Sequence, residues 1–257
     1  MTGETYQCTI CNTPLGAYSI EIEHYKIFKC STCGLESTFP IPSDQELKEF
    51  YTNYLDHRAA EEVVRLNSER HLTILKKFGL DRKMKVLDFG SGSGVFPDVY
   101  GEGCLGYDPF VNSHKDVSSN FEKVQNQQFD AITLWSVLDN QPQPVSTLVK
   151  LVPLLKRNGL LAFTVVSNQN EIPYRYKPPE HLTYWTKAAI KHLLHKLDIE
   201  LLYLEEDIMT QLSNVYINLI CSRIPQEYHK SFLLVANKLP RLVKIPTNEL
   251  YCIGKKR

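Results

Sequence analysis

Two groups of residues have types and spacings that could do chemistry: four cysteines near the N-terminus and a glycine-rich turn near residue 90. The cysteines form two CxxC pairs, Cys8 with Cys11 and Cys30 with Cys33, separated by eighteen residues. Two CxxC pairs can together supply the four ligands of a tetrahedral zinc site. Four thiolates leave no open coordination position, so the pattern predicts structural Zn²⁺. The alternatives are reduced core cysteines and, less compatible with a cytosolic chain, disulfides.

The glycine-rich turn lies in residues 85–94, KVLDFGSGSG. Its apolar residues predict a short buried strand, and glycine lets the backbone turn tightly and lets a ligand approach it. The next strand-like run ends in Asp108, at roughly the spacing at which a carboxylate binds both hydroxyls of a ribose. We therefore expect a nucleoside cofactor, and the alternative is an ordinary strand-to-helix turn. The residues of the turn expected to contact the cofactor are Asp88, Gly90, Ser91, Gly92 and Gly94.

The details of this turn separate the possible nucleoside cofactors. Val95 stands where the dinucleotide pattern G-x-G-x-x-G/A requires a small residue, and the Gly-Lys-Ser/Thr ending of a P-loop is absent. Asp88 followed by Gly90, Gly92 and Gly94 instead resembles motif I of class I S-adenosylmethionine-dependent methyltransferases.

Composition limits the remaining classes. The chain has 257 residues, with 29 basic and 29 acidic side chains and a formal net charge of zero, which gives no overall attraction to nucleic acid or anionic membranes. No run is long and apolar enough to span a bilayer, and MTGETYQC lacks an apolar signal core, so we expect a cytoplasmic protein. Seven cysteines cannot all pair within the chain.

The pattern divides the chain into four segments: a zinc-ribbon module (1–42), a helical linker or lid (43–83), a catalytic core (84–222) and a locally basic C-terminal extension (223–257). Helices are expected at a capping box beginning at Ser43, over 56–78, over 145–156 and from the cap Thr186 to 197. Strands are expected over 18–23, 25–29, 86–89, 104–108, 129–134, 160–166, 200–204 and 215–221, with a weak candidate at 121–124.

The resemblance extends from residue 8 to about 222. It includes CxxC…CxxCG, VLDNQPQP at 137–144 and HLTYWT at 181–186, and the combination is similar to small-molecule methyltransferases that carry a zinc ribbon. It implies an α/β fold, a Rossmann-like seven-stranded sheet with helices on both faces. It also implies methyl transfer from S-adenosyl-L-methionine to a sugar, polysaccharide precursor or natural-product intermediate, by in-line attack on the sulfonium methyl.

The resemblance also implies roles for single residues. Asp108 would hold the ribose, and Trp135 and Ser136 would lie beside the cofactor. His181 could deprotonate an acceptor hydroxyl, because its ordinary pKa lies near neutrality, or it could only order a loop. Tyr184 is a weaker catalytic candidate and is better suited to a pocket wall. Asn140 replaces a histidine of the family pattern, so a role as base does not transfer to it.

Two rival functions stay open. An RNA base methyltransferase could use the zinc ribbon to grip RNA, although the zero net charge and the acidic hairpin containing Glu21 and Glu23 argue against it. A methyltransferase-like module could also have lost catalysis and bind a partner. The sequence leaves the acceptor, the methylated atom and the oligomeric state open, and predicts no membrane association.

Overall fold

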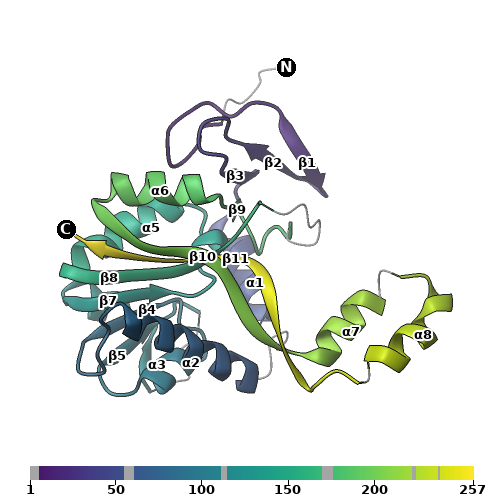
Figure 1. Cartoon of the computed structure of the whole chain (residues 1–257). Coiled ribbons are helices and arrows are strands. Elements are labelled where there is room, and N and C mark those ends of the chain that lie inside the picture. The colour runs from purple at the N-terminus through teal and green to yellow at the C-terminus, as the bar shows by residue number, and fades with distance from the viewer. Residues whose placement is uncertain (1–5, 55–60, 111–114, 170–175, 222–223, 237) are drawn as a thin grey trace.

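The computed structural model describes residues 6–54, 61–110, 115–169, 176–221, 224–236 and 238–257. They form a seven-stranded sheet between two layers of helices, a small four-stranded sheet above it, and an arm that projects from one side (Figure 1).

The large sheet has the strand order β10-β11-β8-β7-β4-β5-β6. Strands β6, β5, β4, β7 and β8 run parallel, whereas β11 is antiparallel to both β8 and β10. The predicted seven-stranded α/β sheet is therefore confirmed. The bounds are β4 Val86–Phe89, β5 Cys104–Tyr107, β6 Val117–Ser118, β7 Phe129–Leu134, β8 Leu155–Val166, β10 Ile199–Leu212 and β11 Leu242–Lys256.

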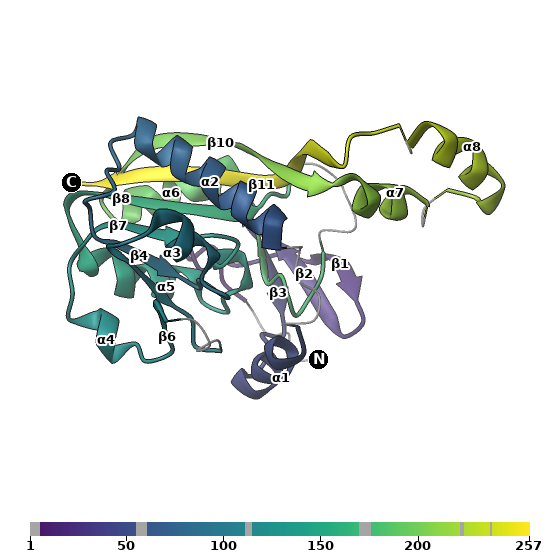
Figure 2. The same ribbon diagram turned by 90° about the horizontal axis from the view of Figure 1, so that it is seen from below.

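The central strands are apolar on both faces because helices cover both sides of the sheet. One side carries α2 (Glu61–Lys77) and α3 (Val95–Tyr100), and the other carries α5 (Pro144–Leu151) and α6 (Lys187–Lys196) (Figure 2). Each layer has its own buried core: Leu75 and Phe96 pack with Val86 on the first side, and Ile190 and Leu193 belong to the core on the second. The short helix α4 (Glu122–Gln125) precedes β7, and two 3-10 turns cover Leu138–Asn140 and Val152–Leu154.

The N-terminal residues form a hairpin, β1 (Tyr18–Ile22) and β2 (Tyr25–Lys29), followed by β3 (Glu36–Phe39). This sheet continues into the core, because β3 pairs with β9 (Thr183–Tyr184), which directly precedes α6. Helix α1 (Asp44–Tyr54) begins with the predicted capping box, in which Glu46 Oε2 accepts from Ser43 N at 2.7 Å. The N-terminal module therefore shares backbone hydrogen bonds with the catalytic core.

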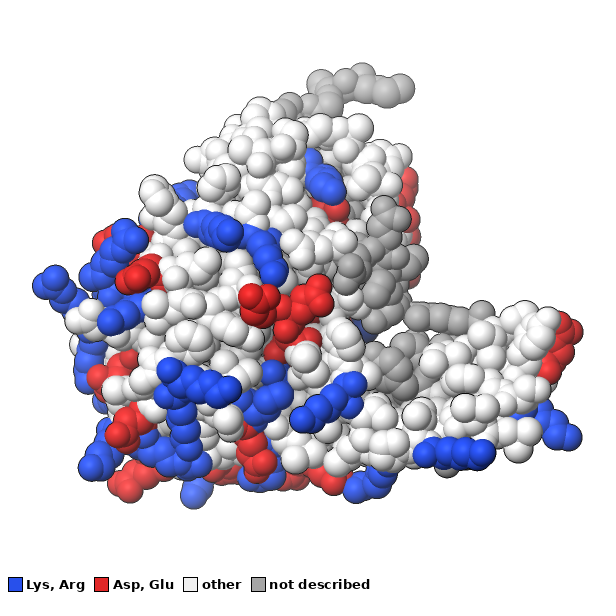
Figure 3. Space-filling view, viewed as in Figure 1, with Lys and Arg blue, Asp and Glu red and all other residues white. Residues whose placement is uncertain are grey.

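The arm is the continuation of β10 and β11 beyond the sheet, capped by α7 (Ser213–Cys221) and α8 (Gln226–Ala236) (Figure 1). The two strands stay paired along its root, up to Leu212 opposite Leu242. On the face drawn in Figure 3, the arm has few charges, and the basic and acidic side chains of the body are interspersed.

Three local predictions were wrong in the type or place of an element, and the helix expected over 145–156 overran the start of β8 at Leu155. The run 215–221, expected to be the last strand, belongs to α7, because a short apolar run fits a helix as well as a strand. The sheet is completed instead by β11, from the segment assigned to the C-terminal extension. The weak strand candidate at 121–124 falls on α4, and the third strand is the two-residue β6, too short to give a pattern.

Candidate functional site

A cavity of about 600 Å³ opens at the carboxyl ends of β4, β5 and β7, the edge at which open α/β sheets bind ligands. The glycine turn forms one wall, α2 forms another, and Met209 of β10 closes a third side. Of the predicted cofactor-binding residues, those that line this cavity are Asp88, Gly90, Ser91, Gly92, Asp108, Trp135 and Ser136. Gly94 lies outside the lining, at the start of α3, with φ +81°.

The two glycines at the head of the turn meet different surroundings. Gly90 has φ +78°, and a Cβ built on it would lie 2.4 Å from Cγ2 of Val137, so no larger residue fits. Gly92 has φ +53°, and a Cβ there would meet no atom within 4 Å. The backbone at Gly92 is therefore open for a ligand to approach.

Asp108 directly follows β5, and its carboxylate points back to the glycine turn. Its Oδ2 accepts from Gly92 N and its Oδ1 accepts from Phe110 N, each at 2.9 Å. Each carboxylate oxygen can accept more than one hydrogen bond. The side chain is therefore held in the cavity wall in a fixed orientation.

Asp88 lies at the base of the cavity and is 2% exposed. Burial raises the pKa of its carboxyl to about 7, although Thr133 Oγ1 donates to it at 2.6 Å. Among the other lining residues, the polar atoms Ser91 Oγ, Trp135 Nε1 and Asn140 Oδ1 are buried and have no hydrogen-bond partner among the described residues. Unpaired buried polar groups are costly, so these atoms fit a cavity that a polar ligand completes.

Ser136, at the end of β7, has φ +51°, and its N donates to Thr164 Oγ1 at 2.8 Å. Its hydroxyl donates to Glu249 Oε2 at 3.3 Å. Trp135 stacks on the ring of His71 with 4.1 Å between ring centroids. The residues after β7 thus connect the cavity to α2 on one side and to β11 on the other.

The four N-terminal cysteines converge, with their Sγ atoms all within 4.8 Å of one another. The Cys8–Cys33, Cys11–Cys30 and Cys11–Cys33 sulfur pairs are 3.6, 3.3 and 3.9 Å apart. A tetrahedral Zn²⁺ with Zn–S bonds near 2.3 Å places its sulfurs about 3.8 Å apart, so the cluster is compatible with a zinc site. The hydrogen bond between Cys8 and Cys33 lowers the pKa of the Cys8 thiol and raises the pKa of the Cys33 thiol.

A family model described as a methyltransferase domain matches residues 54–204, more than half of the chain. The match spans the glycine turn, Asp108 and the residues after β7. The chain belongs to the methyltransferase domain family. The family implied by motif I is thereby confirmed, and the protein is a methyltransferase.

Solved structures share the fold of this methyltransferase at low sequence identity. An S-adenosylmethionine-dependent methyltransferase of Archaeoglobus fulgidus is 16% identical (80% of this chain, 99% of that chain, TM-score 0.50). The 1,6-didemethyltoxoflavin-N1-methyltransferase of Burkholderia thailandensis, solved with S-adenosylhomocysteine, is 13% identical. The match covers 94% of this chain and 99% of that chain, with a TM-score of 0.53. A chain of the complex between the Haloferax volcanii Trm112 methyltransferase activator and a methyltransferase is 14% identical (83% and 97%, TM-score 0.54). Comparison with curated protein sequences gives no match.

The segment 181–186 of the methyltransferase lies apart from the cavity lining. Tyr184 is fully buried, and its hydroxyl donates to the carbonyl oxygen of His181 at 2.9 Å. His181 has Nε2 3.6 Å from the Glu180 carboxylate and is also absent from the cavity lining. Thr186 N-caps α6 as predicted and donates to the carbonyl oxygen of Cys33 at 2.6 Å. The structure therefore uses this segment to join the cysteine module to the core.

Sequence reasoning missed several polar residues of the cavity. Asn67, Ser68 and His71 reach it from α2, and Gln141 reaches it from the turn after β7. The sequence gives only a weak indication of them, because each is a single polar residue within a segment that is predicted to be a packing helix or a loop.

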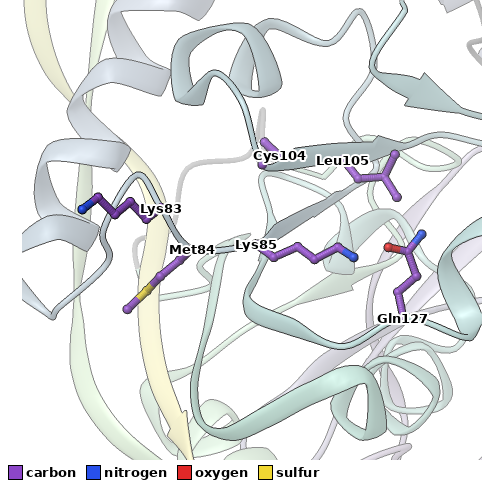
Figure 4. Close-up of a pocket in the computed structure, with 7 residues that line it drawn as sticks. Lys83, Met84, Lys85, Cys104, Leu105 and Gln127 are labelled. Atoms are coloured by element: carbon purple, nitrogen blue, oxygen red, sulfur yellow. The ribbon is translucent and has the colours of Figure 1, made fainter.

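A second hollow, of about 450 Å³, lies at the opposite ends of β4 and β5 (Figure 4). Its lining includes Lys83, Met84, Lys85 and Gln127, and none of the predicted site residues. In the part of the chain that the structure describes, the methyltransferase has no helix both long and apolar enough to cross a membrane.

Proposed function

We propose that the chain transfers a methyl group from S-adenosylmethionine to a small-molecule acceptor, such as a sugar, a polysaccharide precursor or a natural-product intermediate. The observation that carries the proposal is the cavity itself. It combines a backbone opened by Gly92, the oriented carboxylate of Asp108 and unpaired polar atoms on Ser91 and Trp135.

The residues present fit this cofactor. Asp108 would accept from the ribose hydroxyls, and the backbone of the glycine turn would admit the methionyl part. When bound, the cofactor supplies a methyl group already activated by its sulfonium. The protein then has to align the reactants, exclude water and remove a proton where the acceptor requires it.

The cavity lining favours a small uncharged or cationic acceptor. Its walls are largely apolar or aromatic, with Val64, Phe96, Phe110 and Met209 among them. The only formally charged side chains in the described lining, histidine apart, are Asp88 and Asp108. A nucleic acid would need Lys or Arg for its phosphates, so this lining argues against the RNA alternative. The toxoflavin-precursor enzyme of Burkholderia thailandensis, which shares the fold, supports a small-molecule acceptor by analogy alone.

Calorimetric titration with S-adenosylmethionine and S-adenosylhomocysteine tests the cofactor site. We expect both to bind wild-type protein and Asp108→Ala to weaken binding at least about 100-fold, through loss of two charge-assisted hydrogen bonds. Asp98→Ala, an exposed change on α3, is the matched control and should bind normally. Absence of heat with the wild type would favour the inactive-module alternative, and unchanged affinity in Asp108→Ala would refute the ribose assignment.

Transfer of a radioactive methyl group to candidate acceptors tests the substrate class. We expect label in small hydroxyl or amine compounds and none in bulk RNA. Label in RNA, with binding that weakens steeply as salt rises, would overturn the small-molecule assignment.

For the cysteine cluster, we propose a structural zinc ion held by Cys8, Cys11, Cys30 and Cys33. Its support is the convergence of four sulfurs at distances suited to tetrahedral coordination. Elemental analysis of purified protein should find one zinc per chain, and Cys30→Ser should lose it while Cys221→Ser, on α7, keeps it. Well under one zinc per chain in the wild type would rule the site out.

A further inference from the structure

One titratable pair in the cavity belongs neither to the glycine turn nor to the Asp108 side of the site. His71 of α2 lines the cavity, and its Nε2 lies 3.1 Å from Oδ2 of Asp207 on β10. Its ring lies flat against Trp135, with 11° between the ring planes. The side chains of His71 and Asp207 are both buried, at 6% and 1% exposure. The pair joins residues 136 positions apart at one wall of the cavity.

The surroundings of His71 fix its ring and its charge state. Asp207 also forms an ion pair with Arg70, which lies beside His71 on α2. Burial raises the pKa of Asp207, but its bonds and charge interactions with His71 and Arg70 outweigh this and lower it, so Asp207 is a carboxylate. Because a carboxylate only accepts hydrogen bonds, Nε2 of His71 carries the proton that it donates. Burial lowers the pKa of His71, so the ring is neutral near pH 7 and Nδ1 keeps its lone pair.

Helix α2 is held firmly against β10 at this point. Asn67 makes two hydrogen bonds with the backbone of Thr210, donating to its carbonyl oxygen at 3.0 Å and accepting from its N at 2.8 Å. Tyr251 of β11 donates to the carbonyl oxygen of His71 at 3.4 Å. These contacts hold His71 in place, as a proton acceptor in a reaction site requires.

The order of the strands places His71 at the acceptor end of the cavity. Asp108 follows β5, on one side of the glycine turn. Asp207 belongs to β10, the strand at the opposite edge of the sheet. With the ribose held at Asp108, the space beside Trp135, Met209 and His71 is the part left for an acceptor. His181 and Tyr184 are not in this lining.

We propose that His71 accepts the proton of the attacking acceptor group and that Asp207 is the positioning residue that holds its ring. This inference rests on the proposed function. As the acceptor's O–H or N–H bond breaks, its proton moves to Nδ1 of His71. The electron pair of the acceptor forms the new bond to the methyl carbon, and the carbon–sulfur bond breaks with its pair left on sulfur. The imidazolium that results is stabilised by the Asp207 carboxylate.

The test uses the charge difference between two probes and requires no known acceptor. S-adenosylmethionine carries a sulfonium charge that S-adenosylhomocysteine lacks. If His71 faces the reacting end, its protonation should weaken binding of the first relative to the second. The ratio of their dissociation constants should stay flat near pH 7 and rise as pH falls below the ordinary histidine pKa, by about tenfold once the ring is protonated, the size of effect expected for unit charges roughly 10 Å apart at an effective dielectric near 20. Calorimetry at several pH values measures this ratio.

Variants separate His71 from the other groups that face it. Asp88, across the cavity, and Glu249, behind Ser136, also titrate near neutrality. Arg70, Asp207 and Tyr251 contact or flank His71. The difference between wild type and His71→Gln therefore decides the result. In His71→Gln the ratio should lose most of its pH dependence while S-adenosylhomocysteine still binds, which also shows that the variant is folded. Asp207→Asn should move the transition to lower pH, an effect that a merely structural role would not produce.

His192→Gln, an exposed change on α6, is the matched control and should behave as wild type. A ratio that is flat in wild type, or that keeps its pH dependence in His71→Gln, would overturn the assignment of His71 and leave the cofactor site standing. Failure of both probes to bind the wild type would overturn the proposed function as well.

Discussion

At the scale of single residues, the glycine turn shows how two glycines of one motif can serve different ends. Gly90 lets the turn pass close to Val137, whereas Gly92 leaves an open wall beside the Asp108 carboxylate. Both have positive φ, so an L side chain adds backbone strain at either position. At Gly90, the close packing against Val137 requires glycine. At Gly92, glycine keeps the backbone accessible to a ligand.

This difference predicts opposite results for two alanine substitutions. Gly90→Ala should lower the free energy of unfolding by about 2–4 kcal/mol, because its Cβ collides with Val137 in addition to the strain. Gly92→Ala should cost only about 1–2 kcal/mol of strain but weaken cofactor binding roughly tenfold. Denaturant unfolding and calorimetry measure the two effects. Equal affinity of Gly92→Ala and wild type would contradict the open-wall interpretation.

Buried carboxyl groups give a second prediction. Burial raises the pKa of Asp88, Asp139 and Glu249 to about 7 each. Between the ordinary carboxyl pKa and pH 7, the native state binds protons that the unfolded chain has lost, so stability falls as pH rises through this window. Glu249→Gln removes one such group and can keep the hydrogen bond with Ser136. Between pH 5 and pH 8, the melting temperature of Glu249→Gln should fall less than that of wild type, and the two falls should differ by about 5 °C. Parallel melting curves would contradict the prediction.

Functional residues could be predicted from the sequence where they belong to a local motif, with the other members close by along the chain. The CxxC pairs, the glycine turn and the acid after the next strand all come together as expected. His71 and Asp207 could not be found in this way, because the bond between them joins distant segments and neither position stands out within its helix or strand.

At the scale of elements, the segment 181–186 joins two parts of the fold. β9 adds to the edge of the N-terminal sheet, and Thr186 begins α6 while contacting the loop that carries Cys33. Asn168 reinforces this connection, since its amide donates to the carbonyl oxygen of Gly34 at 2.8 Å. The resemblance implied a pocket role for this segment, whereas its contacts explain the same residues as a connection.

Thr186 provides the test of this connection. Thr186→Val removes both the cap of α6 and the bond to Cys33, and should lower the free energy of unfolding by about 2 kcal/mol. Thr186→Ser keeps the hydroxyl and should lose less than half as much. If the two variants unfold alike, the hydroxyl is not what stabilises this contact. Thermal or denaturant unfolding gives the comparison.

Elements were predictable where a local signal marks an end. The capping box before α1 and the cap of α6 are such signals, and both helices begin where expected. The run 215–221 has no such signal, and its apolar character alone could not distinguish α7 from a strand. The strand β11 was missed because its pairing with β8 is set by tertiary contacts.

At the scale of the whole molecule, the helices that cap the arm, α7 and α8, stand apart from the cavity. Only Ala236 is buried among the described side chains of α8, and Tyr228, Leu234 and Val235 are exposed. The ion pair between Arg241 and Glu62 connects the root of the arm to α2, but both side chains are largely exposed and such pairs contribute little. Met209 and Thr210, which serve the cavity and its wall, lie in the paired root of the arm, before the helices that cap it.

Deleting the arm should therefore leave the rest of the protein intact. Residues 213–241 can be replaced by Asn-Gly, because Leu212 and Leu242 already face each other across an antiparallel pair and this dipeptide favours a tight hairpin turn. We expect unchanged affinity for S-adenosylhomocysteine and a melting temperature within about 3 °C of wild type. Loss of binding, or a much lower melting temperature, would show that the arm supports the core.

The position of β11 between β8 and β10 has a consequence for biosynthesis. During translation, β8 emerges from the ribosome well before its neighbour and presents an unpaired apolar edge until residues 242–256 follow. Glu249 and Tyr251, which back the cavity at Ser136 and His71, arrive only with that last strand. A nascent chain therefore reaches its full complement of cavity contacts late, and depends until then on protection from aggregation.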